Sequence, residues 1–106
     1  MSQIISVPEY VSNDDRNDAY YFIRMLTKSL PIKSEEKLST INGVKLKLLY
    51  NKTVLKREAD LQIEHMGKFY STKFLHSDLH RYNDLETNWL VSFILNNKKE
   101  IENFVI

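Results

Sequence analysis

The sequence lacks cysteine, has only two glycines and two prolines, and contains no long apolar run. The absence of cysteine excludes disulfides, thiol catalysis and cysteine-based metal sites, and it is typical of a reducing compartment. The longest mostly apolar run, "WLVSFIL", is far shorter than the roughly 20 residues of a membrane-spanning helix. The N-terminal stretch also lacks the basic start and apolar core of a secretory signal. We therefore predict a cytoplasmic protein that does not associate with membranes.

The sequence also lacks the usual signs of an active site. Gly43 and Gly67 stand alone, so no glycine-rich phosphate loop is present, and the carboxylates are spread along the chain. The string "HSDLH" places His76 and His80 at metal-ligand spacing, but a third ligand would have to be His65. The predicted strands separate His65 from His76 by more than a metal-ligand distance. We expect no enzyme, metal or cofactor, and a small metal-dependent enzyme is the third hypothesis.

The residues that are present indicate a folded domain. The chain has 106 residues, of which 42% are hydrophobic and 11% aromatic, so one domain spanning residues 1–106 is expected. Its net charge of +1 argues against a general nucleic-acid binder. The charge is unevenly distributed, because residues 28–73 hold ten basic and five acidic residues whereas both ends of the chain are acidic.

The first predicted helix covers "SNDDRNDAYYFIRMLTKSLP", residues 12–31. Ser12 or Asn13 can cap its first N–H groups, and Asp14 and Asp15 complement its dipole. Helical spacing predicts one buried stripe, which consists of Ala19, Phe22, Ile23, Leu26 and Leu30. Pro31 ends the helix. Upstream, residues 3–7 can form a fourth edge strand, and downstream "SEEKLSTING" is predicted to be one irregular helical turn.

From residue 44 to residue 75 the apolar period changes to two, which is typical of strands. The residues expected to face inward are Val44, Leu46, Leu48 and Tyr50 on the first strand and Leu55, Ala59, Leu61 and Ile63 on the second. Arg57 is the one inward misfit. A two-residue turn at Asn51 and Lys52 would pair Leu48 with Leu55. The same register would place Val44 opposite Ala59, Lys47 opposite Lys56, and Leu49 opposite Val54.

The second hairpin turns at "HMGK". A two-residue loop at Met66 and Gly67 pairs Ile63 with Tyr70, and it pairs Ala59 with Phe74, with Asp60 beside Lys73. A three-residue loop is also compatible with the sequence.

A second helix follows from Asn83. Asn83 and Glu86 have capping-box spacing, with Asp84 in the first turn. The apolar stripe of this helix is Leu85, Trp89, Leu90, Phe93, Ile94 and Ile101. The helix either runs toward Asn103 or breaks near residues 96–97.

These elements predict an α+β fold of order α-β-β-β-α, with a three-stranded antiparallel meander packed on two helices. This order resembles that of double-stranded-RNA-binding domains. The resemblance implies a basic start to the second helix that holds RNA phosphates, but here "YNDLETNWL" offers Asp84 and Glu86 at that place. The loop "YNKT" is also too short to reach into a groove. An RNA- or DNA-binding module that uses the basic hairpin is therefore the alternative function.

The preferred hypothesis is a surface that binds another protein. The first candidate surface is the exposed side of the first hairpin, where apolar residues lie among lysines and no helix is left to cover them. Its residues are Lys45, Lys47, Leu49, Val54 and Lys56, with Phe69 and Leu75 on the third strand. The second is the acidic start of the first helix, where Asp14, Asp15, Asp18 and Tyr21 could cover a basic active site.

We therefore predict a small non-enzymatic domain that binds a partner protein. Its most concrete form is an immunity, antitoxin or anti-defence inhibitor that occludes a toxin or nuclease. The same residues are compatible with a homodimer formed through the open sheet face or a free strand edge.

Overall fold

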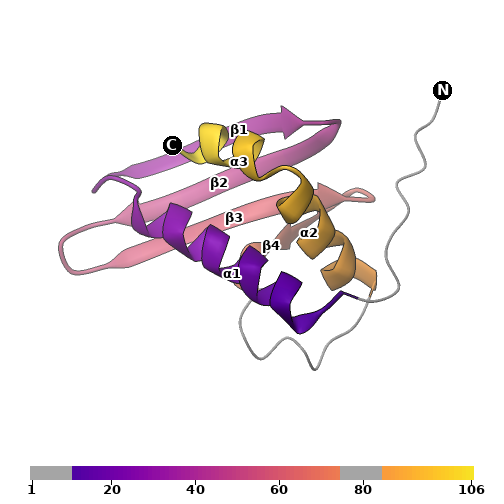
Figure 1. The fold of residues 1–106 in the computed structure, drawn as a ribbon. Helices are drawn as coiled ribbons and strands as arrows, with labels where there is room; N and C mark the ends of the chain where they lie inside the picture. The colour runs from indigo at the N-terminus through magenta and orange to yellow at the C-terminus, as the bar shows by residue number, and fades with distance from the viewer. Residues whose placement is uncertain (1–10, 75–84) are drawn as a thin grey trace.

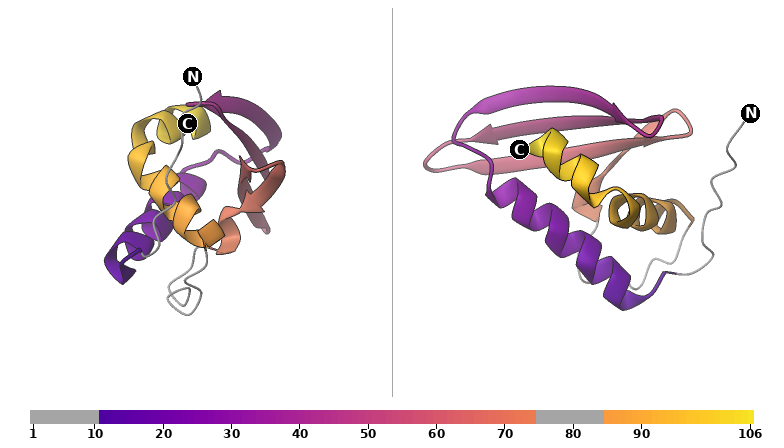
Figure 2. Two further views of the ribbon diagram at one scale, coloured as in Figure 1. Left: turned by 90° about the vertical axis from the view of Figure 1, so that its right-hand side faces the viewer. Right: turned by 45° about the horizontal axis from the view of Figure 1, so that its top comes forward.

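The computed structural model describes residues 11–74 and 85–106. Its elements are, in chain order, α1 (Asn13–Lys28), β1 (Ser34–Ile41), β2 (Val44–Lys52), β3 (Arg57–His65), β4 (Lys68–Ser71), the 3-10 helix η1 (Thr72–Phe74), α2 (Leu85–Asn96) and α3 (Lys98–Val105). The strands form one antiparallel sheet in the order β1-β2-β3-β4. All three α-helices lie on the same face of this sheet (Figures 1 and 2). The predicted α+β class is confirmed, with four strands in the described sheet.

The expected helical turn at residues 34–43 was wrong, because this segment forms strand β1. Its turn into β2 consists of Asn42 and Gly43, which both have positive φ (49° and 82°), as a tight two-residue hairpin turn requires. The side chains of β1 that face the helices are mostly polar, namely Glu35, Lys37 and Ser39. A strand at the margin of a sheet tolerates such residues. Because they replace apolar residues, β1 lacks the alternation of apolar and polar residues by which a strand is predicted from sequence.

The first predicted hairpin was correct in the faces of its strands and wrong in its register. Leu48 pairs with Leu61, so the connection is the longer segment Thr53–Lys56. Leu46, Leu48 and Leu61 are buried as predicted, whereas Leu55 is 98% exposed. Lys47 therefore opposes Gln62 and Leu49 opposes Asp60, so neither faces Lys56 or Val54. Arg57 is exposed.

The second hairpin has the shorter of the two predicted loops. Ile63 pairs with Tyr70, and the turn at Met66 and Gly67 again has two positive φ angles. β4 ends at Ser71, so the predicted pairing of Ala59 with Phe74 does not form.

Helix α1 begins at its predicted cap and ends at Lys28, before the predicted end at Pro31. The side chain of Ser12 accepts a hydrogen bond from the backbone N–H of Asp15 (3.1 Å). At the other end Lys52, which is only 7% exposed, donates from Nζ to the carbonyl oxygens of Lys28 (3.1 Å), Thr27 (3.4 Å) and Leu30. A lysine that was predicted to lie in a turn thus caps the negative end of the helix.

The C-terminal helix breaks at Asn97, one of the two alternatives. The Asn97 side chain is buried and donates from Nδ2 to the Phe93 carbonyl oxygen (2.8 Å). Its Oδ1 accepts a hydrogen bond from the side chain of Asn42. This asparagine therefore links the break between α2 and α3 to the turn between β1 and β2.

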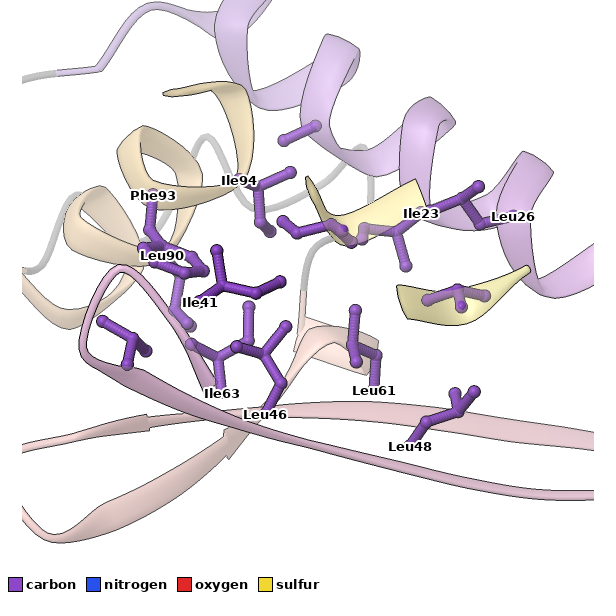
Figure 3. Packing of buried hydrophobic residues seen from close by; sticks show 14 of the residues in the cluster. Ile23, Leu26, Ile41, Leu46, Leu48, Leu61, Ile63, Leu90, Phe93 and Ile94 are labelled. Carbon is purple, nitrogen blue, oxygen red and sulfur yellow. The ribbon is translucent and has the colours of Figure 1, made fainter. Parts of the chain in front are cut away.

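The hydrophobic core lies between the sheet and the helices. Leu46, Leu48, Leu61 and Ile63 point from the sheet toward Ile23 and Leu26 of α1 and toward Leu90, Phe93 and Ile94 of α2 (Figure 3). Arg16 is also buried in α1 and donates from Nη2 to Asn88 Oδ1 of α2 (3.2 Å). The predicted stripe of α1 is confirmed, with Phe22 partly buried at its side.

Several predictions concern residues outside the described ones: the strand at residues 3–7, the capping role of Asn83, the first-turn position of Asp84, the outward position of Leu75, and the pair His76 and His80. Within residues 11–74 and 85–106, no helix has the length and hydropathy needed to cross a membrane.

Candidate functional site

The face of the sheet that points away from the helices, called the outer face here, is left uncovered by the described helices (Figure 2). The pairing registers place fourteen side chains on it. They are Ser34, Glu36, Leu38 and Thr40 on β1, Lys45, Lys47, Leu49 and Asn51 on β2, Glu58, Asp60, Gln62 and Glu64 on β3, and Phe69 and Ser71 on β4. These positions hold four carboxylates and two lysines, so their formal charge is −2.

The two lysines of the outer face, on which the alternative nucleic-acid hypothesis depends, each lie beside a carboxylate. Lys47 Nζ is 3.4 Å from Glu36 Oε1 across the β1–β2 pair, and Lys45 Nζ is 3.9 Å from Glu64 Oε2 across the β2–β3 pair. Exposed ion pairs of this kind contribute little to stability. They do lower the positive potential that a phosphate backbone would need, because such binding depends on neutralising phosphates.

Asp60 is the most firmly positioned acidic group of the outer face. Its carboxylate accepts hydrogen bonds from Ser71 Oγ and from Gln62 Nε2 (2.9 Å). Leu49 lies directly opposite it on β2. Together with Glu36 and Glu58 they line a shallow open hollow, with Lys73 at its border. This part of the surface offers an apolar floor among fixed hydrogen-bond acceptors.

Three apolar side chains lie among these charges. Leu38 is 69% exposed in the row of Lys47 and Gln62, and Phe69 is 44% exposed opposite Glu64. Leu49 is half-buried between its neighbours. Leu38, Leu49 and Phe69 are thus surrounded by polar side chains. This arrangement matches the composition of a protein-binding surface, in which a polar rim encloses apolar contacts.

Val54 and Lys56, which were predicted to belong to the same surface, lie instead in the loop between β2 and β3. Thr53 fixes this loop: its N–H donates to the Lys56 carbonyl oxygen (2.7 Å), and its Oγ1 accepts from the N–H groups of Lys56 (2.9 Å) and Leu55 (3.3 Å). Val54 and Leu55 are consequently held in solvent. Lys56 Nζ lies 3.4 Å from Glu58 Oε1 at the end of the outer face. The loop therefore adjoins the outer face without being part of it.

The acidic start of α1 forms a separate surface on the helical side of the molecule. Asp14, Asp18 and Tyr21 are exposed and recur at helical spacing on one stripe, and Asp15 lies exposed beside them. The stripe continues to Met25, which is also exposed. The structure thus brings together the four residues predicted for this surface. It places them on the opposite side from Lys45, Lys47 and Leu49.

A hydrogen bond between buried Tyr50 and half-buried Glu35 joins the edge strand to its neighbour on the inner side of the sheet. The hydroxyl of Tyr50 donates to Glu35 Oε2 (2.7 Å), and Lys33 Nζ lies 3.2 Å from the same oxygen. Burial and the hydrogen bond to Glu35 raise the pKa of Tyr50 to about 12, and the bond from Tyr50, with that from Lys33, lowers the pKa of Glu35. Both residues also line the hollow, and their hydrogen bond joins β1 to β2.

The histidine that was considered as a metal ligand has a packing role in the structure. The His65 ring stacks on Trp89 with centroids 4.1 Å apart, and Trp89 stacks on Phe93 (5.3 Å). Within residues 11–74 and 85–106, no three His, Cys, Asp or Glu side chains are grouped so that they could hold a metal ion.

The outer-face residues that were not predicted from the sequence lie mainly on β1. Glu36 and Leu38 belong to the outer face only because residues 34–41 are a strand. Two signals could have found it: "NG" at positions 42–43 favours a hairpin turn, and the following strand needs a partner on that side. Comparison of this chain with protein-family models, curated proteins and solved structures gives no match.

Proposed function

We propose that this chain is a non-enzymatic protein-binding domain and that the outer face of its sheet contacts the partner. One observation supports the proposal most: an uncovered four-stranded face carries Leu38, Leu49 and Phe69 among carboxylates that outnumber the lysines. The partner surface that complements this face is apolar at its centre and basic around it. In its most concrete form the domain is an immunity, antitoxin or anti-defence inhibitor that occludes a toxin or nuclease.

Charge supports a protein partner over a nucleic acid. On the outer face Lys45 and Lys47 are each within 4.0 Å of a glutamate, and Asp60 adds a fixed negative charge between the strands. A phosphate backbone would have to displace the glutamates and would be repelled by the aspartate. The RNA- or DNA-binding alternative stays a prediction. A purified sample with a high 260/280 nm absorbance ratio that high salt abolishes would support it.

The test uses two double variants, one on the outer face and one on α1, and each replaces two large side chains that are exposed or half-buried. The first, Leu49→Lys with Phe69→Lys, places positive charge on the outer face. The second, Tyr21→Lys with Met25→Lys, makes the same change on α1. A tagged chain captures partners from the cells in which the sequence occurs, mass spectrometry identifies them, and calorimetry measures the affinity of the purified partner for each variant.

We expect the outer-face variant to lose at least about 2 kcal/mol of binding free energy, roughly 30-fold in affinity, because such apolar anchors dominate interfaces. The α1 variant should bind as the unchanged chain does. The reverse result would move the interface to the acidic surface of α1 and contradict the assignment to the sheet. Recovery of the chain alone, under low and moderate salt, would contradict the proposed function itself.

A further inference from the structure

The outer edge of strand β1 is a margin of the sheet that the described part of the chain leaves unpaired. β1 pairs with β2 on one side, and no other strand of residues 11–74 and 85–106 lies along its second side (Figure 1). Because a two-residue turn closes the hairpin, Ile41 and Val44 form a hydrogen-bonded pair, and every second residue of β1 repeats that pattern. The intervening residues direct their N–H and C=O groups away from β2. They are Ser34, Glu36, Leu38 and Thr40.

The edge of β1 lacks most of the features that protect natural sheet edges against pairing, and an exposed apolar residue, Leu38, lies at its centre. Natural edges avoid pairing by means of charges, prolines, bulges or short length. β1 is eight residues long, contains no proline, and has Leu38 at its centre, 69% exposed. Its charged residues, Glu35, Glu36 and Lys37, lie toward the start of the strand. These charges restrict the registers in which a second strand can pair with it.

If β1 pairs with β1 of a second copy around a two-fold axis, the position of the axis decides which side chains lie opposite each other. An axis at Glu36 places the two Glu36 side chains opposite each other, and an axis at Lys37 does the same for the two lysines, so both registers oppose like charges. An axis at Ser39 shortens the overlap and separates the two leucines. An axis at Leu38 leaves no like charges opposed.

The register centred on Leu38 opposes two leucines at its axis and places an uncharged residue opposite each charged one, including Ile41 opposite Glu35. Leu38 meets Leu38 of the second copy, and Glu36 lies opposite Thr40 on the outer face. On the inner face Lys37 lies opposite Ser39. The hydrogen-bonding groups of Leu38 already point outward, so both copies can exchange two bonds at the axis without a change in the backbone.

We propose that two copies of this chain associate through β1, antiparallel and centred on Leu38, so that the two sheets form one continuous sheet. The outer faces of both copies then lie on the same side, because opposed residues in an antiparallel pair share a face. The inference does not depend on the proposed function, since it concerns the strand edge and its test needs no other protein.

The first test is the mass of the full chain in solution at roughly 10–100 μM, the concentration range in which a weak interface is populated. Sedimentation should give twice the 12.6 kDa mass of one chain. Leu38→Lys opposes two lysines at the axis and should give the monomer, with an unchanged circular dichroism spectrum. Val54→Lys changes another exposed apolar residue away from the edge and should leave the dimer intact. A monomeric unchanged chain would overturn the proposal.

The second test fixes the register and exploits the absence of cysteine from the chain. In Leu38→Cys the two sulfurs belong to a directly opposed pair with Cα atoms about 5.5 Å apart, within the range of a disulfide. In Glu36→Cys the two equivalent residues are offset by four positions, about 13 Å along the strands. Oxidation should therefore cross-link Leu38→Cys and leave Glu36→Cys as single chains on a non-reducing gel. Equal cross-linking of the two variants, or cross-linking of Glu36→Cys alone, would refute this register.

Discussion

Lys52 links β2 to the C-terminal end of α1 through hydrogen bonds, and a substitution can test how much this link contributes to stability. Replacing it with Met keeps the apolar stem and removes the ammonium group that donates to the carbonyl oxygens of Thr27, Lys28 and Leu30. Hydrogen bonds that involve a charged group contribute about 1.5–3 kcal/mol each. The contact with Thr27 is long, at 3.4 Å, so two effective bonds remain. Water can reach the end of a helix and satisfies part of the loss.

We therefore expect Lys52→Met to lower the free energy of unfolding by about 2–3 kcal/mol, which corresponds to a decrease in Tm of roughly 10–20 °C for a domain of this size. Urea unfolding followed by circular dichroism measures the change, and an unchanged m-value would show that the loss is in stability. Lys56→Met is the matched control, since Lys56 is exposed in the loop and should cost less than about 0.5 kcal/mol. Equal effects of the two substitutions would refute the capping role of Lys52.

Two further predictions concern the hydrogen-bonded pair Tyr50 and Glu35 and the buried side chain of Asn97. The pKa of Tyr50 is raised from 10.0 to about 12, so its contribution to stability is complete below pH 10 and is lost as the pH rises toward 12. The pKa of Glu35 is lowered from 4.5, so its contribution is lost as the pH falls below that value. Tyr50→Phe should flatten both limbs of a plot of urea midpoint against pH, and limbs as steep as before would contradict the pairing. Asn97→Ala removes buried bonds to Asn42 and Phe93 and should cost about 1–3 kcal/mol in urea unfolding, whereas exposed Asn96→Ala should cost under about 0.5. A similar cost for both would show that the helix break does not depend on Asn97.

The sequence predicted the faces of the strands better than their pairing. In both the expected and the observed register an apolar residue lies opposite Leu48, namely Leu55 or Leu61, because the two differ by an even number of positions. Alternation alone therefore could not choose between them. The start of α1 and the turn at Gly67 were predictable because N-caps and tight turns depend on neighbouring residues.

The candidate site was predicted less completely, for a related reason. β1 contributes few apolar side chains to the core, so no local pattern reveals it, and its pairing with β2 is decided by the turn and by backbone hydrogen bonds. Lys45, Lys47 and Leu49 were correctly placed on the exposed side of their strand. The residues that lie opposite them on the adjacent strands were predicted incorrectly, because those residues depend on which strands pair with β2 and in which register.

The strand order has a consequence for how the chain folds. Each strand pairs with the next one in the sequence, so the sheet can form through short hairpin closures. The helical layer cannot, because α1 packs against α2, and the hydrogen bond from Arg16 to Asn88 joins residues 72 positions apart. Closing that long loop is entropically costly unless the intervening sheet has already shortened it. We therefore expect the sheet to bring together α1 and α2, which precede and follow it in the sequence, and the docking of α1 onto α2 to complete the core.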